Sequence, residues 1–127
     1  TEECFGEDPY LAGRLTEALV RGMQGTSLDG LFAADKAPVV LKHFAGQGAT
    51  VGGRNSAESE LGRRELHEIH LPAARAGVRA GAAAVMAAYN EVDGMPCSGN
   101  RALLTGLLRG GFEGSIEITC SFAMARL

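Results

Sequence analysis

Residues 38–55 read PVVLKHFAGQGATVGGRN, and this stretch decides how the rest of the chain is interpreted. Residues 38–44 are apolar and β-branched over a short run, which is typical of a buried strand. The polar residues of this run, Lys42 and His43, come at its carboxyl end. The glycine-rich residues 46–55 predict a loop with tight backbone turns. The stretch therefore predicts a strand that delivers two polar side chains to a glycine-rich loop.

The residues before and after this stretch predict helices. Asp8-Pro9 places a capping carboxylate before a proline, so a helix is expected over 9–23, ending near Gly25. Residues 58–81 also have helical character, and Pro72 divides them into two parts. In the helix over 9–23 the large apolar residues recur at every fourth position, at Leu11, Leu15 and Leu19.

The second half of the chain continues the alternation. Residues 82–89 suit another buried strand, residues 90–99 a loop, and 115–119 a third strand. Asn100 can cap a helix whose apolar stripe is Leu103, Leu104, Leu107 and Leu108. Alternating helices and strands predict an α/β fold with a parallel sheet. Because three strands cannot bury both sheet faces well, and the chain starts at a helix signal and stops after a strand, we expect a fragment.

Composition excludes several classes of protein. Apolar residues make up 46% and charged residues 21%, so the chain can bury a core. The net charge is -3 with no basic block, so nucleic acid is not an expected partner. Apolar runs are shorter than the roughly 20 residues of a membrane span, so no membrane partner is expected. No CxxC spacing occurs, so three ordinary thiols are expected at Cys4, Cys97 and Cys120.

Two motifs that could hold a cofactor or a metal are incomplete. The loop containing Gly46-Gln-Gly48 lacks the third glycine of a dinucleotide fingerprint, because residue 51 is Val51. It also lacks the GK[ST] sequence of a phosphate-binding loop. His67 and His70 are three residues apart, whereas the zinc motif HExxH needs a spacing of four. No cofactor and no metal are therefore expected.

Polar side chains follow two successive predicted strands, and this coincidence indicates a site. Lys42 and His43 end one strand, and Tyr89 and Asn90 end the next. In parallel α/β folds, ligands bind at the carboxyl edge of the sheet. From the spacing alone, a structural role for Lys42 and His43 stays open. Met86, inside the second strand, is more often a core residue than a ligand contact.

Seven motifs occur in the order in which one known family has them. This chain is similar to the N-terminal barrel domain of glycoside hydrolase family 3, the β-glucosidase and β-xylosidase family, over about residues 3–114. The motifs are FGEDPYL at 5–11, KHFAG at 42–46, GGRN at 52–55, ELHEIHLP at 65–72, VMAAYN at 85–90, DGMPC at 93–97 and LLT at 103–105.

The resemblance implies a partial (β/α)8 barrel, incomplete at both ends, with its active site at the carboxyl ends of the strands. It also implies retaining hydrolysis of terminal β-D-glucosyl or β-xylosyl residues, without metal or organic cofactor. Lys42 and His43 match the pair that donates hydrogen bonds to sugar hydroxyls. Tyr89 matches a tyrosine beside the nucleophile, and Met86 would line the same pocket. The implied partners are an oligosaccharide or β-glucoside substrate, the rest of the barrel and a second domain.

The end of the chain departs from the family pattern. After the turn GFEG at 111–114, the family has a nucleophilic aspartate where this sequence has Thr119. A threonine hydroxyl with no assigned base is a poor nucleophile. The tail 115–127 diverges from the family, as a frameshift or a damaged gene end would make it. The family's sugar-binding arginine and acid/base carboxylate also belong to regions outside the chain.

These observations lead to two expectations. The first is a fragment of a retaining β-glycosidase that is inactive alone, with no catalytic residue of its own because Thr119 occupies the nucleophile position. The alternative is a short non-catalytic sugar-binding or regulatory protein derived from the same barrel. A nucleotide- or metal-binding α/β domain is a third interpretation, and it depends on the incomplete motifs.

Overall fold

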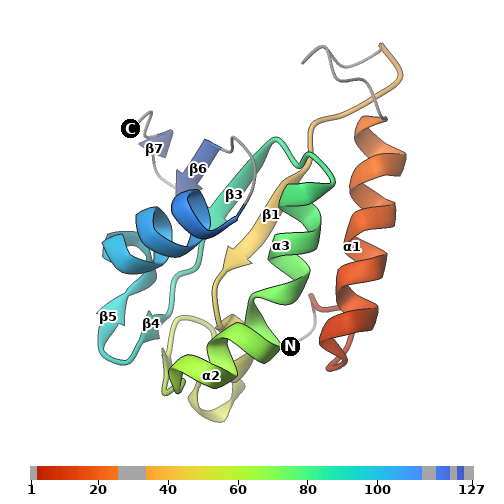
Figure 1. Cartoon of the computed structure of the whole chain (residues 1–127). Coiled ribbons are helices and arrows are strands. Elements are labelled where there is room, and N and C mark those ends of the chain that lie inside the picture. Colours follow the sequence, from red (N-terminus) through yellow and green to blue (C-terminus); the bar gives the residue numbers. More distant parts are fainter. Residues whose placement is uncertain (1–2, 26–33, 113–116, 121–122, 125–127) are drawn as a thin grey trace.

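The computed structural model describes residues 3–25, 34–112, 117–120 and 123–124. Helices and strands alternate along the chain, and α1 and α3 pack side by side (Figure 1). The elements are α1 (Pro9–Gln24), β1 (Val40–Phe44), η1 (Gln47–Ala49), η2 (Val51–Gly53), β2 (Glu58–Ser59), α2 (Arg63–Glu65), η3 (Leu66–His70), α3 (Pro72–Arg79), β3 (Ala84–Ala87), β4 (Glu91–Val92), β5 (Met95–Pro96), η4 (Cys97–Gly99), η5 (Ala102–Arg109), β6 (Glu117–Cys120) and β7 (Ala123–Met124).

The main sheet has the order β1-β3-β6-β7, and its first three strands are parallel. Leu41 of β1 lies opposite Val85 of β3, and Val85 lies opposite Ile118 of β6. These are the three strands that the sequence predicts, although residues 115–116 of the third lie outside the described residues. The predicted α/β class is confirmed. Within the described part of the chain, β1, β3, β6 and β7 form an open sheet, and β2, β4 and β5 form a second sheet of three strands.

The ends of α1 follow from its capping residues. Asp8 Oδ1 accepts hydrogen bonds from the backbone N–H groups of Tyr10 (2.8 Å) and Leu11 (3.0 Å), and Pro9 occupies the first turn. At the other end, Gly25 has a φ of 77°, which a side chain would make unfavourable. The predicted helix is therefore confirmed, and it extends to Gln24.

The buried face of α1 is not the face that carries its leucines. Gly13, Thr16 and Val20 are buried, because small residues let α1 approach α3 closely: a Cβ on Gly13 would lie 3.5 Å from Ala76 Cβ. The leucine face stays partly exposed, at 49%, 41% and 42% for Leu11, Leu15 and Leu19. Among the described residues, the packing of α1 thus depends on small side chains rather than on its leucines.

This difference predicts unequal effects of two core-type substitutions on α1. Val20 is fully buried, so Val20→Ala should lower the free energy of unfolding by about 2 kcal/mol. Leu15→Ala removes a larger side chain, but from a half-exposed site, and should change the free energy of unfolding by less than about 1 kcal/mol. Urea unfolding of both variants measures this. A larger effect at Leu15 would show that the leucine face is covered in solution.

Two segments differ from the sequence-based expectation. The helical segment expected from residue 58 begins only at Arg63, because Glu58 and Ser59 form β2 and pair with β4. The expected loop 90–99 contains the hairpin β4–β5, whose turn is Asp93-Gly94. Both turn residues have positive φ values, 49° and 77°, as the tightest hairpins require. Two other expectations are confirmed. Pro72 divides the helical segment, since α3 begins there. Asn100 caps the following helix, because its Oδ1 accepts a hydrogen bond from Leu103 N at 3.0 Å.

A buried glutamine at the end of α1 forms hydrogen bonds with the backbone at the amino ends of β1 and β3. Gln24, at the end of α1, is 7% exposed. Its Oε1 accepts hydrogen bonds from Val39 N (2.7 Å) and Ala83 N (3.1 Å). Its Nε2 donates to the Gly81 carbonyl at 2.6 Å. This end of the sheet is therefore held by one polar side chain that uses three of its four hydrogen-bonding positions.

Candidate functional site

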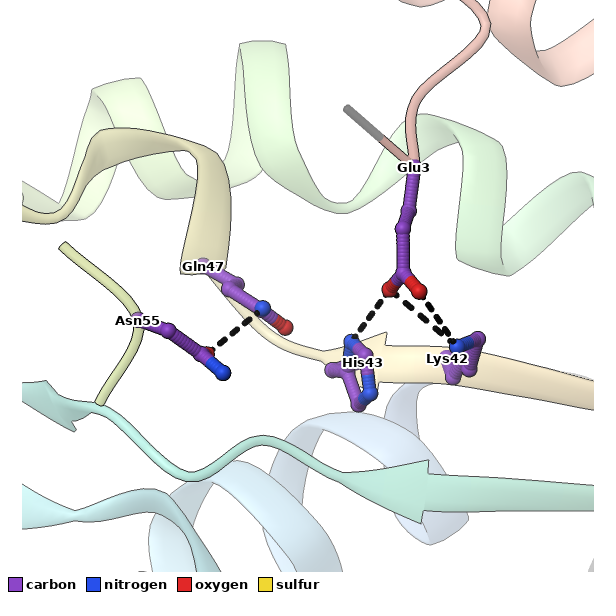
Figure 2. A network of polar contacts seen from close by, with 5 residues as sticks. All are labelled: Glu3, Lys42, His43, Gln47 and Asn55. Atoms are coloured by element: carbon purple, nitrogen blue, oxygen red, sulfur yellow. Dashed lines mark hydrogen bonds and ion pairs between the residues drawn. The ribbon is translucent and has the colours of Figure 1, made fainter. Parts of the chain in front are cut away.

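Lys42 and His43 lie at the carboxyl end of β1, and both approach the carboxylate of Glu3 (Figure 2). Lys42 Nζ donates to both carboxylate oxygens of Glu3, at 3.1 Å each. His43 Nδ1 lies 3.9 Å from Glu3 Oε2. The register with β3 shifts between Leu41 and Phe44, so the regular alternation of a strand does not hold there. The Lys42–His43 and Phe44–Ala45 peptide bonds are cis.

The three charged or titratable groups differ in exposure. The side chain of His43 is 11% exposed, while those of Lys42 and Glu3 are 48% and 61% exposed. Burial lowers the pKa of His43, the Lys42 ammonium lowers it further, and the Glu3 carboxylate opposes both. With its pKa below 6.5, the imidazole is neutral at pH 7. It then offers one hydrogen-bond donor and one acceptor.

Tyr89 completes this group from the next strand. It follows β3, is 44% exposed, and its ring centroid lies 5.7 Å from that of His43. Lys42, His43 and Tyr89 line one open cleft of about 1210 Å³ together with Glu3. The structure thus brings together the polar residues that end β1 and β3, and their role in binding stays a prediction.

Two residues that the sequence associates with this group have other positions. Met86 is half-buried on β3, in register with Thr119 of β6, and is not among the described residues that line the cleft. Asn90 is fully buried and turns away from Tyr89's surroundings to bond the backbone. Its Nδ2 donates to the Ala45 carbonyl (3.2 Å) and to Ser59 Oγ (3.1 Å). Asn90 therefore does not line the cleft, and it connects the backbone after β1 to β2.

The glycine-rich loop forms a second wall of the cleft. Gly46 has a φ of 78°, and its carbonyl accepts a hydrogen bond from Ser59 Oγ at 2.9 Å. This confirms the prediction of a tight turn. Gln47 follows, and its Nε2 donates to Asn55 Oδ1 at 3.0 Å, beside the Glu3 contact (Figure 2). No donor among the described residues reaches the buried Gln47 Oε1.

The third wall comes from α2 and η3, the two helical segments before α3. His70 and Glu65 line the cleft there. Burial lowers the pKa of His70, and the Glu65 carboxylate opposes this shift. His67 does not line the cleft, so the two histidines do not converge on it. Among the described residues, no group of three His, Cys, Asp or Glu side chains is placed to hold a metal ion.

Sequence reasoning missed Glu3, Gln47 and Asn55 as members of this cleft. The local pattern does not encode the position of Glu3, since Glu3 meets Lys42 across 39 positions of the sequence. Gln47 and Asn55 contact each other within the glycine-rich loop that follows β1, and the position of that loop is the signal that could have found them. The cleft as a whole presents hydrogen-bond donors and acceptors beside the rings of His43 and Tyr89, which suits a polar ligand rich in hydroxyl groups. None of the described helices is long and apolar enough to cross a membrane.

Comparison with known proteins gives one consistent result. The model of the glycosyl hydrolase family 3 N-terminal domain matches residues 1–127. A β-xylosidase of Formosa agariphila is 38% identical over 118 residues, which are 91% of this chain and 16% of that protein. A periplasmic β-glucosidase of Salmonella typhimurium is 38% identical over 116 residues, 88% of this chain and 14% of that protein.

Solved structures give the same relationship. The crystal structure of a β-glucosidase from Listeria innocua in complex with gluconolactone matches with a TM-score of 0.87 and 36% identity. The match covers 94% of this chain and 16% of that one. This chain therefore spans about one sixth of the length of these relatives.

Proposed function

The chain belongs to glycoside hydrolase family 3, as part of its N-terminal domain, and on this premise we propose that its cleft is the sugar-binding side of a β-glycosidase site. The proposed ligand is a terminal β-D-glucosyl or β-xylosyl residue of an oligosaccharide or glycoside. Relatives named β-glucosidase and β-xylosidase, and a relative solved with gluconolactone, support this ligand class.

The convergence of Lys42, His43 and Tyr89 on one cleft carries this proposal. A pyranose presents several hydroxyl groups, each of which can donate and accept a hydrogen bond. Lys42 supplies donors only, neutral His43 supplies one donor and one acceptor, and Tyr89 supplies a hydroxyl. The rings of His43 and Tyr89 also offer apolar faces to the C–H groups of a sugar. Met86 stays in the proposal as a residue of the same site, as the family resemblance implies, although it is not among the described residues that line the cleft.

For the fold, we propose that the described strands are part of a (β/α)8 barrel. Three parallel strands with intervening helices and a site at their carboxyl ends are what such a barrel requires. The rest of the barrel and a second domain would belong to a longer protein, in keeping with relatives of which this chain covers 14–16%.

For the chemistry, we propose that this chain alone binds sugar without hydrolysing it. Retaining hydrolysis needs two carboxyl groups about 5–5.5 Å apart, one as nucleophile and one as acid/base. Thr119, in register with Met86, stands where the family resemblance puts the nucleophile. A neutral hydroxyl does not replace that carboxylate.

The missing nucleophile leads to a direct prediction. The purified 127-residue chain should release no aryl group from an aryl β-D-glucoside above the rate in buffer. Absorbance of the released phenolate measures this. Hydrolysis that Lys42→Ala abolishes would refute the proposal of an inactive chain while supporting the site.

The binding proposal predicts a specific loss of affinity. Lys42→Ala removes a charged donor from the cleft and should weaken D-glucose binding at least ~10-fold, as loss of a hydrogen bond to a charged group does. Lys36→Ala is the matched control, since Lys36 contacts Asp35 and the Gly22 carbonyl and does not line the cleft. Calorimetric titration compares them. An equal effect of the two substitutions would contradict the proposed site.

A further inference from the structure

Glu3 makes a contact whose purpose the proposed function does not yet include. Both of its carboxylate oxygens lie 3.1 Å from Lys42 Nζ, and Oε2 lies 3.9 Å from His43 Nδ1. The contact joins the segment before α1 to the end of β1. It therefore places a carboxylate next to the two donors on which sugar binding is proposed to depend.

The carboxylate also keeps capacity for further hydrogen bonds. An ionised carboxylate offers about four acceptor positions, and Lys42 uses two of them. The Glu3 side chain is 61% exposed and lines the cleft. A strong donor and a strong acceptor thus stand side by side at the cleft, which is the arrangement that two neighbouring hydroxyl groups of a pyranose can satisfy.

We propose that Glu3 is a positioning and acceptor residue of the sugar site: it holds Lys42 and His43 in place, and its free acceptor positions receive a hydroxyl from a vicinal diol of the terminal sugar. This inference rests on the proposed function and adds a residue to it. The ligand class is thereby narrowed to pyranoses with two adjacent free hydroxyl groups that can reach Glu3 and Lys42 together.

If the contact served only the stability of the fold, loss of the Glu3 charge would lower the melting temperature and leave ligand affinity unchanged. The proposal expects the melting temperature to stay nearly unchanged, because exposed ion pairs contribute little to folding stability. Loss of a positioning group should instead change ligand affinity and the environment of His43. Stability and affinity therefore separate the two roles.

The test uses the full chain and three variants. Glu3→Gln removes the charge, Glu3→Asp keeps the charge with a shorter reach, and Glu60→Gln is the control. Glu60 is another exposed carboxylate and does not line the cleft, so its replacement changes the net charge equally without touching the site. Calorimetry measures D-glucose affinity, NMR follows the His43 imidazole with pH, and thermal unfolding measures stability.

The proposal predicts about a tenfold weaker affinity for Glu3→Gln, partial recovery in Glu3→Asp, and no change in Glu60→Gln. The pKa of His43 should fall further in Glu3→Gln, because Glu3 opposes the lowering by burial and Lys42. If the native chain binds glucose and Glu3→Gln binds it equally well, this inference fails and the proposed function stands. If the native chain binds no glucose, the proposed function fails and takes this inference with it.

Discussion

Gln24→Met should lower the free energy of unfolding by about 3 kcal/mol, because it leaves buried backbone groups without hydrogen-bond partners. The side chain is 7% exposed and bonds Val39 N, Ala83 N and the Gly81 carbonyl. Methionine has a similar length and no polar atoms, so it preserves much of the packing and removes all three bonds. Ala83 N keeps a contact with the Val39 carbonyl at 3.1 Å, so the loss falls on Val39 N and the Gly81 carbonyl.

Urea unfolding followed by circular dichroism measures this effect. Gln47→Met is the matched control, because Gln47 is another glutamine but donates one described side-chain bond, to Asn55, at the rim of the cleft. Its replacement should change the free energy of unfolding by about 1 kcal/mol or less. Equal effects at the two positions would show that Gln24 does not hold the amino ends of β1 and β3.

The second large effect is expected at Gly46. Its φ is 78°, where an L-residue is strained by about 1–2 kcal/mol. A Cβ there would also lie 2.6 Å from Leu61 Cδ1, and such overpacking adds about 1–3 kcal/mol. Gly46→Ala should therefore lower the free energy of unfolding by about 2–5 kcal/mol. Because Gly46 leads directly into Gln47, the same variant should also disturb the cleft.

Gly53→Ala separates the two causes. Gly53 has a φ of 65°, but nothing lies within 4 Å of an added Cβ. Its replacement should show only the backbone strain, about 1–2 kcal/mol. Thermal or urea unfolding of both variants checks the difference. If Gly46→Ala is no more destabilised than Gly53→Ala, the Leu61 side chain moves aside at no cost in free energy. The close contact between Gly46 and Leu61 would then contribute nothing to stability.

The sequence predicts the elements whose signals are local. Asp8, Pro9 and Gly25 bound α1 because an N-cap and a glycine with a positive φ act within one turn of the helix. The strands 82–89 and 38–44 are found because their apolar runs are continuous. The hairpin β4–β5 could also have been found, since Asp93-Gly94 is a strong turn signal.

Local sequence patterns do not predict contacts between segments that are distant in the sequence. Apolar periodicity identifies the leucine face of α1, but the packing partner α3 accepts the Gly13 and Thr16 face, where the backbones come close. Glu3 and Gln24 act on groups far along the chain, so no spacing rule reveals them. The same holds for Asn90, which follows Tyr89 in sequence and yet serves the buried turn at Ala45.

Within the site, the sequence correctly placed Lys42, His43 and Tyr89 at one edge of the sheet, because the carboxyl ends of parallel strands meet there. It did not reveal the carboxylate that the first two share. The family resemblance supplied the proposed ligand, and the structure supplied the geometry in which to test it.

A titration of the isotope-labelled chain with D-glucose, followed residue by residue by NMR, tests the central claim most directly. Binding in the cleft predicts saturable shifts at residues 42–47, Tyr89 and Glu3. The amino ends of the strands, around Gln24 and Gly81, should not shift. An absence of shifts at high sugar concentration, or saturable shifts centred on Gln24, would contradict a sugar site in this cleft.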